Sequence, residues 1–149
     1  MQHVNIKTIL VLVLSFYVYG SSQKLPNEAI LYGPTWKLNF GSGKSYHTFG
    51  FQIHHHYLSS NKYAPLPFSY GGGMDFSVKN GSTAYLDLQS GIIYIGGSAG
   101  IAYNTNHGTG FQATMWGNAL LGADYTYRSF DGGTHATGAY ISLPYFIKD

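Results

Sequence analysis

The chain has 149 residues, enough for one domain, and its composition argues against several classes of protein. Only 9% of the residues are charged, against roughly 25% in an ordinary soluble domain, while aromatic residues reach 17% and 20 residues are glycine. A net charge of +2 without a basic run argues against a nucleic-acid partner, and the lack of cysteine excludes disulfides and thiolate metal sites. A mean hydropathy of -0.07 excludes a helical membrane protein, since no long apolar run follows the N-terminus.

The N-terminus has the pattern of an export signal. Lys7 provides the positive region, residues 9–18 are mostly apolar, and Gly20-Ser21-Ser22 provides the small residues that a signal peptidase needs. We therefore expect a signal peptide over residues 1–22, followed by a single domain over residues 23–149. An uncleaved anchor is the alternative, although the apolar stretch is short for a membrane span.

Segments of strand length then alternate with turn signals, and no helical periodicity is present. The clearest segment is residues 48–58, where Phe49, Phe51 and Ile53 share one face while Gln52, His54 and His56 share the other. In chain order, the predicted strands cover residues 35–40, 48–58, 68–78, 84–88, 93–103, 111–115, 119–128 and 137–145. The predicted turns lie at residues 41–44, 79–81, 89–91, 104–108, 117–118 and 130–134, and the longest break is at 59–65. We predict eight strands joined as consecutive hairpins.

The charges within these strands all fall on the polar face. A soluble barrel would turn this face to water, whereas an outer-membrane barrel would turn it to the lumen and its apolar face to lipid. The polar face consists mostly of Gly, Ser, Thr, Gln and Tyr, with few of the Lys and Glu residues that a water-facing surface carries. We therefore predict an all-β protein, an eight-stranded antiparallel up-and-down transmembrane β-barrel with short loops in the outer membrane.

This architecture assigns an environment to each set of side chains. We expect a polar and charged network in the lumen, formed by Lys37, Gln52, His54, His56, Asp75, Asp87, Asp124 and Arg128. The predicted lipid-facing side chains are Phe49, Phe51, Ile53, Phe76, Leu86, Ile93, Ile95, Leu121 and Ile141. The predicted interfacial aromatic residues are Tyr57, Tyr70, Tyr103, Trp116, Tyr127 and Tyr145. The smallest barrels are filled by side chains, so we expect no transport of large solutes.

Three stretches carry a resemblance to a known group of proteins: residues 33–44 (GPTWKLNFGSGK), residues 88–92 (LQSGI) and residues 112–119 (QATMWGNA). They resemble the small outer-membrane barrel proteins of Gram-negative bacteria, in the size class of OmpA and OmpX. The resemblance implies a fold and a location, with outer-membrane lipid and an envelope assembly as partners. It implies no activity. One departure is that Tyr145-Phe146 is followed by Ile147-Lys148-Asp149, whereas such barrels usually end on an aromatic residue.

The histidine triplet is the most prominent candidate for chemistry. His54 and His56 point the same way, about 7 Å apart, so they are weak candidates for a metal site to which Asp75 would add a carboxylate. Some barrels of this size are lipid A acyltransferases or deacylases, which suggests an alternative that uses His54 or His56 with Ser69 or Ser77 and Asp75. A further alternative is a secreted soluble barrel whose Phe49, Phe51, Phe68, Phe76 and Leu86 line an apolar pocket. We expect a non-enzymatic envelope protein without a cofactor or metal.

Overall fold

The computed structural model describes residues 28–41, 44–57, 68–92, 95–117, 121–130 and 133–147. The predicted signal peptide and the predicted break at 59–65 lie outside these residues. All regular elements in the described part of the chain are β-strands. No helix in this part is long and apolar enough to cross a membrane.

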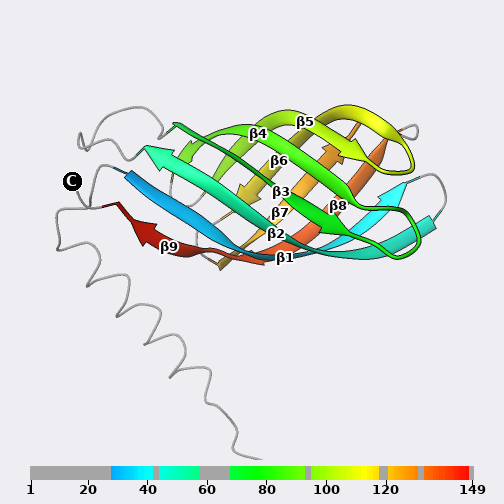
Figure 1. Cartoon of the computed structure of the whole chain (residues 1–149), viewed down its shortest axis with the longest axis horizontal. Helices are drawn as coiled ribbons and strands as arrows, with labels where there is room; N and C mark the ends of the chain where they lie inside the picture. Colours follow the sequence, from blue (N-terminus) through cyan, green and yellow to red (C-terminus); the bar gives the residue numbers. More distant parts are fainter. Residues whose placement is uncertain are drawn as a thin grey trace, which may run out of the picture.

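The strands form a closed antiparallel barrel, seen from the side in Figure 1. In chain order they are β1 (Glu28–Gly41), β2 (Lys44–Tyr57), β3 (Phe68–Phe76), β4 (Thr83–Ile92), β5 (Ile95–Asn104), β6 (Gly108–Gly117), β7 (Leu121–Arg128), β8 (Thr134–Ile141) and β9 (Leu143–Phe146). From β1 to β8 each strand pairs with the next along the chain, and β1 closes the barrel by pairing on its other side with both β8 and β9. The prediction of an eight-stranded up-and-down barrel is confirmed, with β8 and β9 together forming the eighth strand.

The eighth strand is interrupted at Ser142. β8 pairs with β1 from Thr35 to Phe40, and β9 pairs with β1 from Ala29 to Tyr32. Between these two ladders, a Cβ on Gly33 would overlap the carbonyl oxygen of Ile141, so the close approach of the two strands requires glycine there. Pro144, which lacks a backbone donor, lies just beyond the interruption and opposite Leu31.

Several predicted strands are shorter than the observed ones, for example at the start of β2 (Lys44) and of β8 (Thr134), and two differences have a clear cause. The turn that we predict at residues 89–91 is part of a continuous β4, because Gln89, Ser90 and Gly91 pair with Ser98, Gly97 and Gly96 of β5. Small polar residues and glycine suggested a turn there, but the ladder continues as far as the pair Ile92–Ile95. The first strand also begins earlier than predicted, at Glu28, because Glu28 pairs with Tyr57 at the far end of β2.

The burial of side chains is inverted relative to a soluble protein. Among the described residues, the buried set contains six hydrophobic side chains (Ala29, Tyr85, Ala102, Phe130, Ala136 and Tyr140) and 17 polar or charged ones. The burial alternates with the period of two that a strand dictates; in β8, for example, Ala136, Gly138 and Tyr140 are buried while Thr137, Ala139 and Ile141 are exposed. The polar face of the barrel is therefore its interior.

The two ends of the barrel differ. The terminal end is the one where β1 begins and β9 ends, and the turn end is the one that carries Gly41 and the segments between β3 and β4, β5 and β6, and β7 and β8. At the turn end, Phe130 is 6% exposed and packs with Tyr85 and Ala102 over the lumen. The segment is held by Ser129, whose backbone N–H donates to the Phe111 carbonyl and whose hydroxyl accepts from the Phe111 N–H.

Candidate functional site

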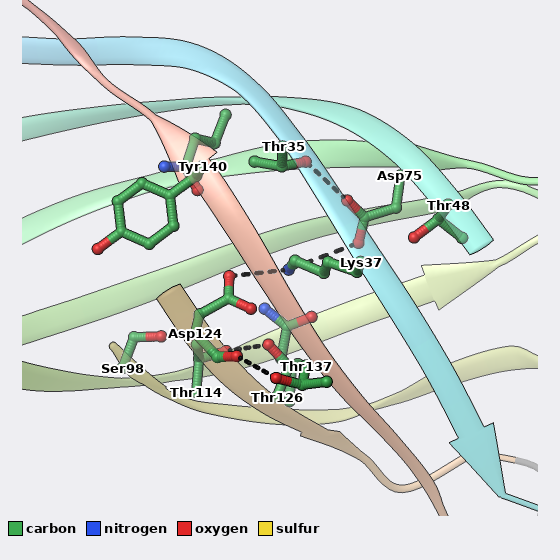
Figure 2. Close-up of polar contacts among 12 residues, drawn as sticks. Thr35, Lys37, Thr48, Asp75, Ser98, Thr114, Asp124, Thr126, Thr137 and Tyr140 are labelled. Atoms are coloured by element: carbon green, nitrogen blue, oxygen red, sulfur yellow. Dashed lines mark hydrogen bonds and ion pairs between the residues drawn. The ribbon is translucent and has the colours of Figure 1, made fainter. Parts of the chain in front are cut away.

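A network of ion pairs crosses the lumen between β1, β3 and β7. Lys37 from β1 lies between two carboxylates, with its Nζ 3.7 Å from Asp75 Oδ2 and 3.6 Å from Asp124 Oδ2 (Figure 2). Arg128 donates from Nη2 to Asp75 Oδ2 and from Nε to Gln112 Oε1 at 2.7 Å. The four charged side chains are 7% exposed or less, so these charges neutralise one another in an interior closed to solvent.

Two further groups complete this network. The Thr35 hydroxyl donates to Asp75 Oδ1 at 3.3 Å (Figure 2). The buried ring of Tyr85 has Lys37 Nζ 5.3 Å and Arg128 Cζ 5.7 Å from its centroid, within the range of cation–π contacts. The Tyr85 ring therefore stabilises both cations where water is excluded.

A second cluster surrounds Asp87 nearer the terminal end. The Ser98 hydroxyl donates to Asp87 Oδ2 at 2.9 Å, and His54 Nε2 lies 3.0 Å from Asp87 Oδ1. Gln89 Nε2 lies 2.7 Å from the same His54 nitrogen. If His54 donates to the carboxylate, the Gln89 amide must present its oxygen, an orientation set by the hydrogen-bond network. Asp87 is thus shared by a histidine and a serine.

The structure places all eight predicted lumen residues inside the barrel. Lys37, His54, Asp75, Asp87, Asp124 and Arg128 are buried, and Gln52 and His56 are half-buried. The predicted metal set is not assembled, because Asp75 belongs to the ion-pair network and the carboxylate beside His54 is Asp87. Within the described ranges, no group of three His, Asp or Glu side chains has the geometry to hold a metal ion.

Large apolar side chains cover the outside of the barrel. Of the predicted lipid-facing residues, Phe49, Phe51, Ile53, Phe76, Leu86, Ile95, Leu121 and Ile141 are all exposed, by 46% to 66%. Ile93 lies outside the described residues. Tyr70, Tyr103 and Tyr145 are also exposed on this surface, while Tyr127 is half-buried and the Tyr57 side chain is not described.

One predicted interfacial residue is wrong in its orientation. Trp116 points into the barrel, where a Cβ on Gly96 of the neighbouring strand would overlap its ring. The reason is the strand period, since Gln112, Thr114 and Trp116 of β6 all lie on the lumen side. Gly96 provides the space that the indole needs.

An empty space remains in the lumen beside these groups, and we call it the luminal pit. Its volume is about 40 Å³, enough for a few water molecules. The side chains that line it are Leu31, Lys37, Gln52, His54, His56, Tyr85, Asp87, Gln89, Ser98, Gln112, Thr114, Trp116, Asp124, Tyr140 and Ser142. The half-buried ones among them include His56, Gln89 and Trp116, near the ends of β2, β4 and β6. The pit therefore opens toward the terminal end.

Comparisons with known proteins give structural neighbours only. No protein-family model matches the chain, and no curated protein matches it. Two solved structures of Ail, the attachment invasion locus protein of Yersinia pestis, are similar to it, one of them in complex with the heparin analogue sucrose octasulfate. Each is 16% identical, covers 80% of this chain and 99% of its own, and has a TM-score of 0.44.

Several lumen residues were missing from the predicted network. Thr35, Tyr85, Ser98, Gln112 and Tyr140 all contact or line the polar interior. The strand period could have identified them, because alternation places each of these residues on the polar face of its strand. Gly, Ser, Thr, Gln and Tyr belong to the predicted polar face, but the predicted network is limited to its charged residues, two histidines and Gln52.

Proposed function

We propose that the protein is an integral outer-membrane β-barrel with a structural or accessory role in the cell envelope. Residues 1–22 would direct its export, and the filled lumen would prevent the passage of large solutes. The observation that carries this proposal is the continuous exposed belt of large apolar side chains around a closed barrel with a charged interior. In water such a belt would be a strong cause of aggregation, whereas in a bilayer it is the stable arrangement.

The strand lengths support a membrane location. β3, β4, β5 and β6 contain 9, 10, 10 and 10 residues, within the range of about 9–11 that a tilted strand needs to cross a bilayer. Closure through β1 pairs the strands around the whole barrel, which a lipid-exposed sheet requires because lipid offers no hydrogen bonds.

The apolar pocket predicted for a soluble ligand-binding barrel is not formed. Four of the five residues that were to line its apolar pocket, Phe49, Phe51, Phe76 and Leu86, point outward and are 46% to 66% exposed. The side chain of Phe68 is not described.

The lipid-modifying enzyme has little support from the geometry. A serine nucleophile needs a histidine within hydrogen-bond distance to accept its proton. Within the described part of the chain, His54 and Ser98 each contact Asp87, so the carboxylate lies between them instead of the histidine. Ser69 is buried on β3 opposite His56.

Membrane fractionation tests the proposed function. The full chain, expressed with its own N-terminus in a Gram-negative host, should appear in the outer-membrane fraction without residues 1–22. Carbonate or high-salt washes should leave it in the pellet, and detergent should release it as a folded barrel that resists SDS until heated. Release into carbonate or high salt without detergent would overturn the proposal.

A further inference from the structure

The turn between β3 and β4 contains an asparagine followed by a glycine, Asn80-Gly81. This turn projects from the turn end of the barrel, outside the apolar belt (Figure 1). Val78 and Lys79, which precede the pair, are both exposed. Water therefore reaches this segment, whereas it is excluded from the strands that face the hydrocarbon core of the membrane.

The fold requires a glycine after Asn80. Gly81 has a φ of 71°, in the left-handed region that favours glycine. A Cβ at this position would also lie 2.4 Å from the hydroxyl oxygen of Thr105, in the turn between β5 and β6. The residue that follows Asn80 therefore carries no side chain to keep its backbone nitrogen away from the Asn80 side chain.

The reactive groups of this pair are not engaged elsewhere. Asn80 is held through its main chain, because its N–H donates to Ser77 Oγ at 3.3 Å and its carbonyl accepts from Asn104 Nδ2 at 3.2 Å. Among the described residues, no hydrogen bond involves the side-chain amide of Asn80 or the backbone N–H of Gly81. Both groups are therefore available to each other and to water.

The other asparagines of the described segments are held differently. Asn39 and Asn104 are buried, at 0% and 1% exposed. Asn106 is exposed, whereas Asn80 is half-buried, but the residue after Asn106 is His107, whose N–H donates to Asn104 Oδ1 at 3.2 Å. The backbone nitrogen that follows Asn106 is thus engaged as a donor and has a bulky side chain beside it.

We propose that Asn80 is a site of spontaneous deamidation, which introduces a negative charge into this turn. Asparagine is among the thermolabile residues. The Gly81 nitrogen attacks Cγ of Asn80 and forms an N–Cγ bond, which closes a cyclic imide. The Cγ–Nδ2 bond breaks, and Nδ2 leaves as ammonia together with the proton from the Gly81 nitrogen. Water then opens the ring, giving aspartate if the new N–Cγ bond is cleaved and isoaspartate if the original peptide bond is cleaved.

This modification goes beyond the proposed function, since a structural barrel does not require it. Both products place a carboxylate next to the exposed Lys79. Isoaspartate also adds a methylene to the main chain. It therefore displaces the carbonyl that accepts from Asn104 and loosens the contact between this turn and the end of β5.

Ageing of the folded barrel tests the proposal. The full mature protein in detergent is incubated at mildly alkaline pH, which favours loss of the Gly81 N–H proton, in water enriched in heavy oxygen. Digestion and sequencing by mass spectrometry then locate each change. Residue 80 should change from amide to acid with uptake of solvent oxygen, and should give separable aspartyl and isoaspartyl peptides. Asn106 should keep its amide.

Two matched variants test the route. Asn80→Gln keeps a side-chain amide, but attack by the Gly81 nitrogen would have to close a larger ring, so residue 80 should stay unconverted. Asn106→Gln, the same change in the turn between β5 and β6, should leave the rate of conversion at Asn80 unaltered.

Three results would overturn the proposal. The first is an intact amide at residue 80 in the folded barrel under conditions that convert it in the urea-denatured chain, because the turn would then protect it. The second is conversion at Asn106 as fast as at Asn80, because exposure and not the unengaged Gly81 nitrogen would then decide the site. The third is equally fast conversion in Asn80→Gln, because hydrolysis would then proceed without the imide.

Discussion

Asp75 illustrates how a charge is tolerated inside this barrel. Its side chain is 1% exposed, and it is contacted by Arg128, Lys37 and the Thr35 hydroxyl. A buried carboxylate is stable only while such partners compensate the loss of hydration. Removal of one member of this network should therefore destabilise the barrel far more than removal of one partner of an exposed ion pair.

We expect Arg128→Met to destabilise the barrel by about 3–5 kcal/mol, because Asp75 would lose its closest cation and Gln112 a hydrogen-bond donor. Methionine keeps much of the length of the arginine side chain, so the loss is mainly one of charge and hydrogen bonds. Urea-induced unfolding in lipid vesicles measures the effect. Lys79→Met, in the exposed turn between β3 and β4, is the control and should change stability by less than about 0.5 kcal/mol. Equal effects of the two substitutions would contradict the account of the network.

At the scale of the strands, glycines determine how much space the lumen side chains have. Gly73 of β3 lies on the inner face, where a Cβ would be 2.5 Å from both the Tyr85 hydroxyl oxygen and the Phe51 carbonyl oxygen. Gly97 of β5 has more room, since the nearest atom to an added Cβ is the Thr114 carbonyl oxygen at 3.4 Å. Packing therefore requires glycine at position 73 but not at position 97.

Gly73→Ala should therefore cost about 1–3 kcal/mol through overpacking, and it should displace the Tyr85 ring from the two cations beside it. Gly97→Ala, the same change in a neighbouring part of the sheet, should alter stability by less than about 0.5 kcal/mol. Both are measured by the same urea unfolding experiment, with tyrosine signals in near-UV circular dichroism reporting on Tyr85. A cost at Gly97 that matches that at Gly73 would show that strand flexibility, and not space for Tyr85, governs these positions.

For the molecule as a whole, the inverted burial decides how a surface mutation behaves. Leu86 is 65% exposed in the middle of β4, and Val78 is fully exposed in the turn between β3 and β4. Leu86→Arg should destabilise the barrel in lipid by about 2–4 kcal/mol, because it places a charge in the hydrocarbon region. Val78→Arg, at an equally apolar exposed position outside the belt, should cost less than about 1 kcal/mol. If both substitutions were neutral in vesicles, the belt would not face lipid.

The alternation of residues along each strand was enough to predict the fold and the face of every lumen charge. Lys37, Asp75, Asp87, Asp124 and Arg128 share the polar face because the strand period is two, and a closed barrel turns that face inward. Their partners could not be predicted in the same way. The pairs Lys37–Asp124 and Asp75–Arg128 join strands far apart in the sequence, and the strand tilt and stagger of the closed barrel determine which side chains meet across it.

The errors have physical causes of the same kind. His54 was assigned to Asp75 on the next strand, but its partner Asp87 lies one strand further on, at the same level of the lumen. Trp116 was assigned to the membrane interface because tryptophan is enriched there, although its parity places it inside. A residue-type preference overrode the strand period, and the period was correct.

The position of β1 has a consequence for how the protein acquires its structure. This strand is the first described element of the chain, yet half of its hydrogen-bonding partners lie in β8 and β9, the last ones. Ala29 cannot pair on that side until Phe146 is available, so the ladder closes only when the two extremes of the chain meet. Contacts over such sequence distances form slowly because loop-closure entropy must be overcome first. The chain therefore has to be protected from aggregation until β9 pairs with β1. Its assembly is for this reason more prone to failure than the folded barrel is to unfolding.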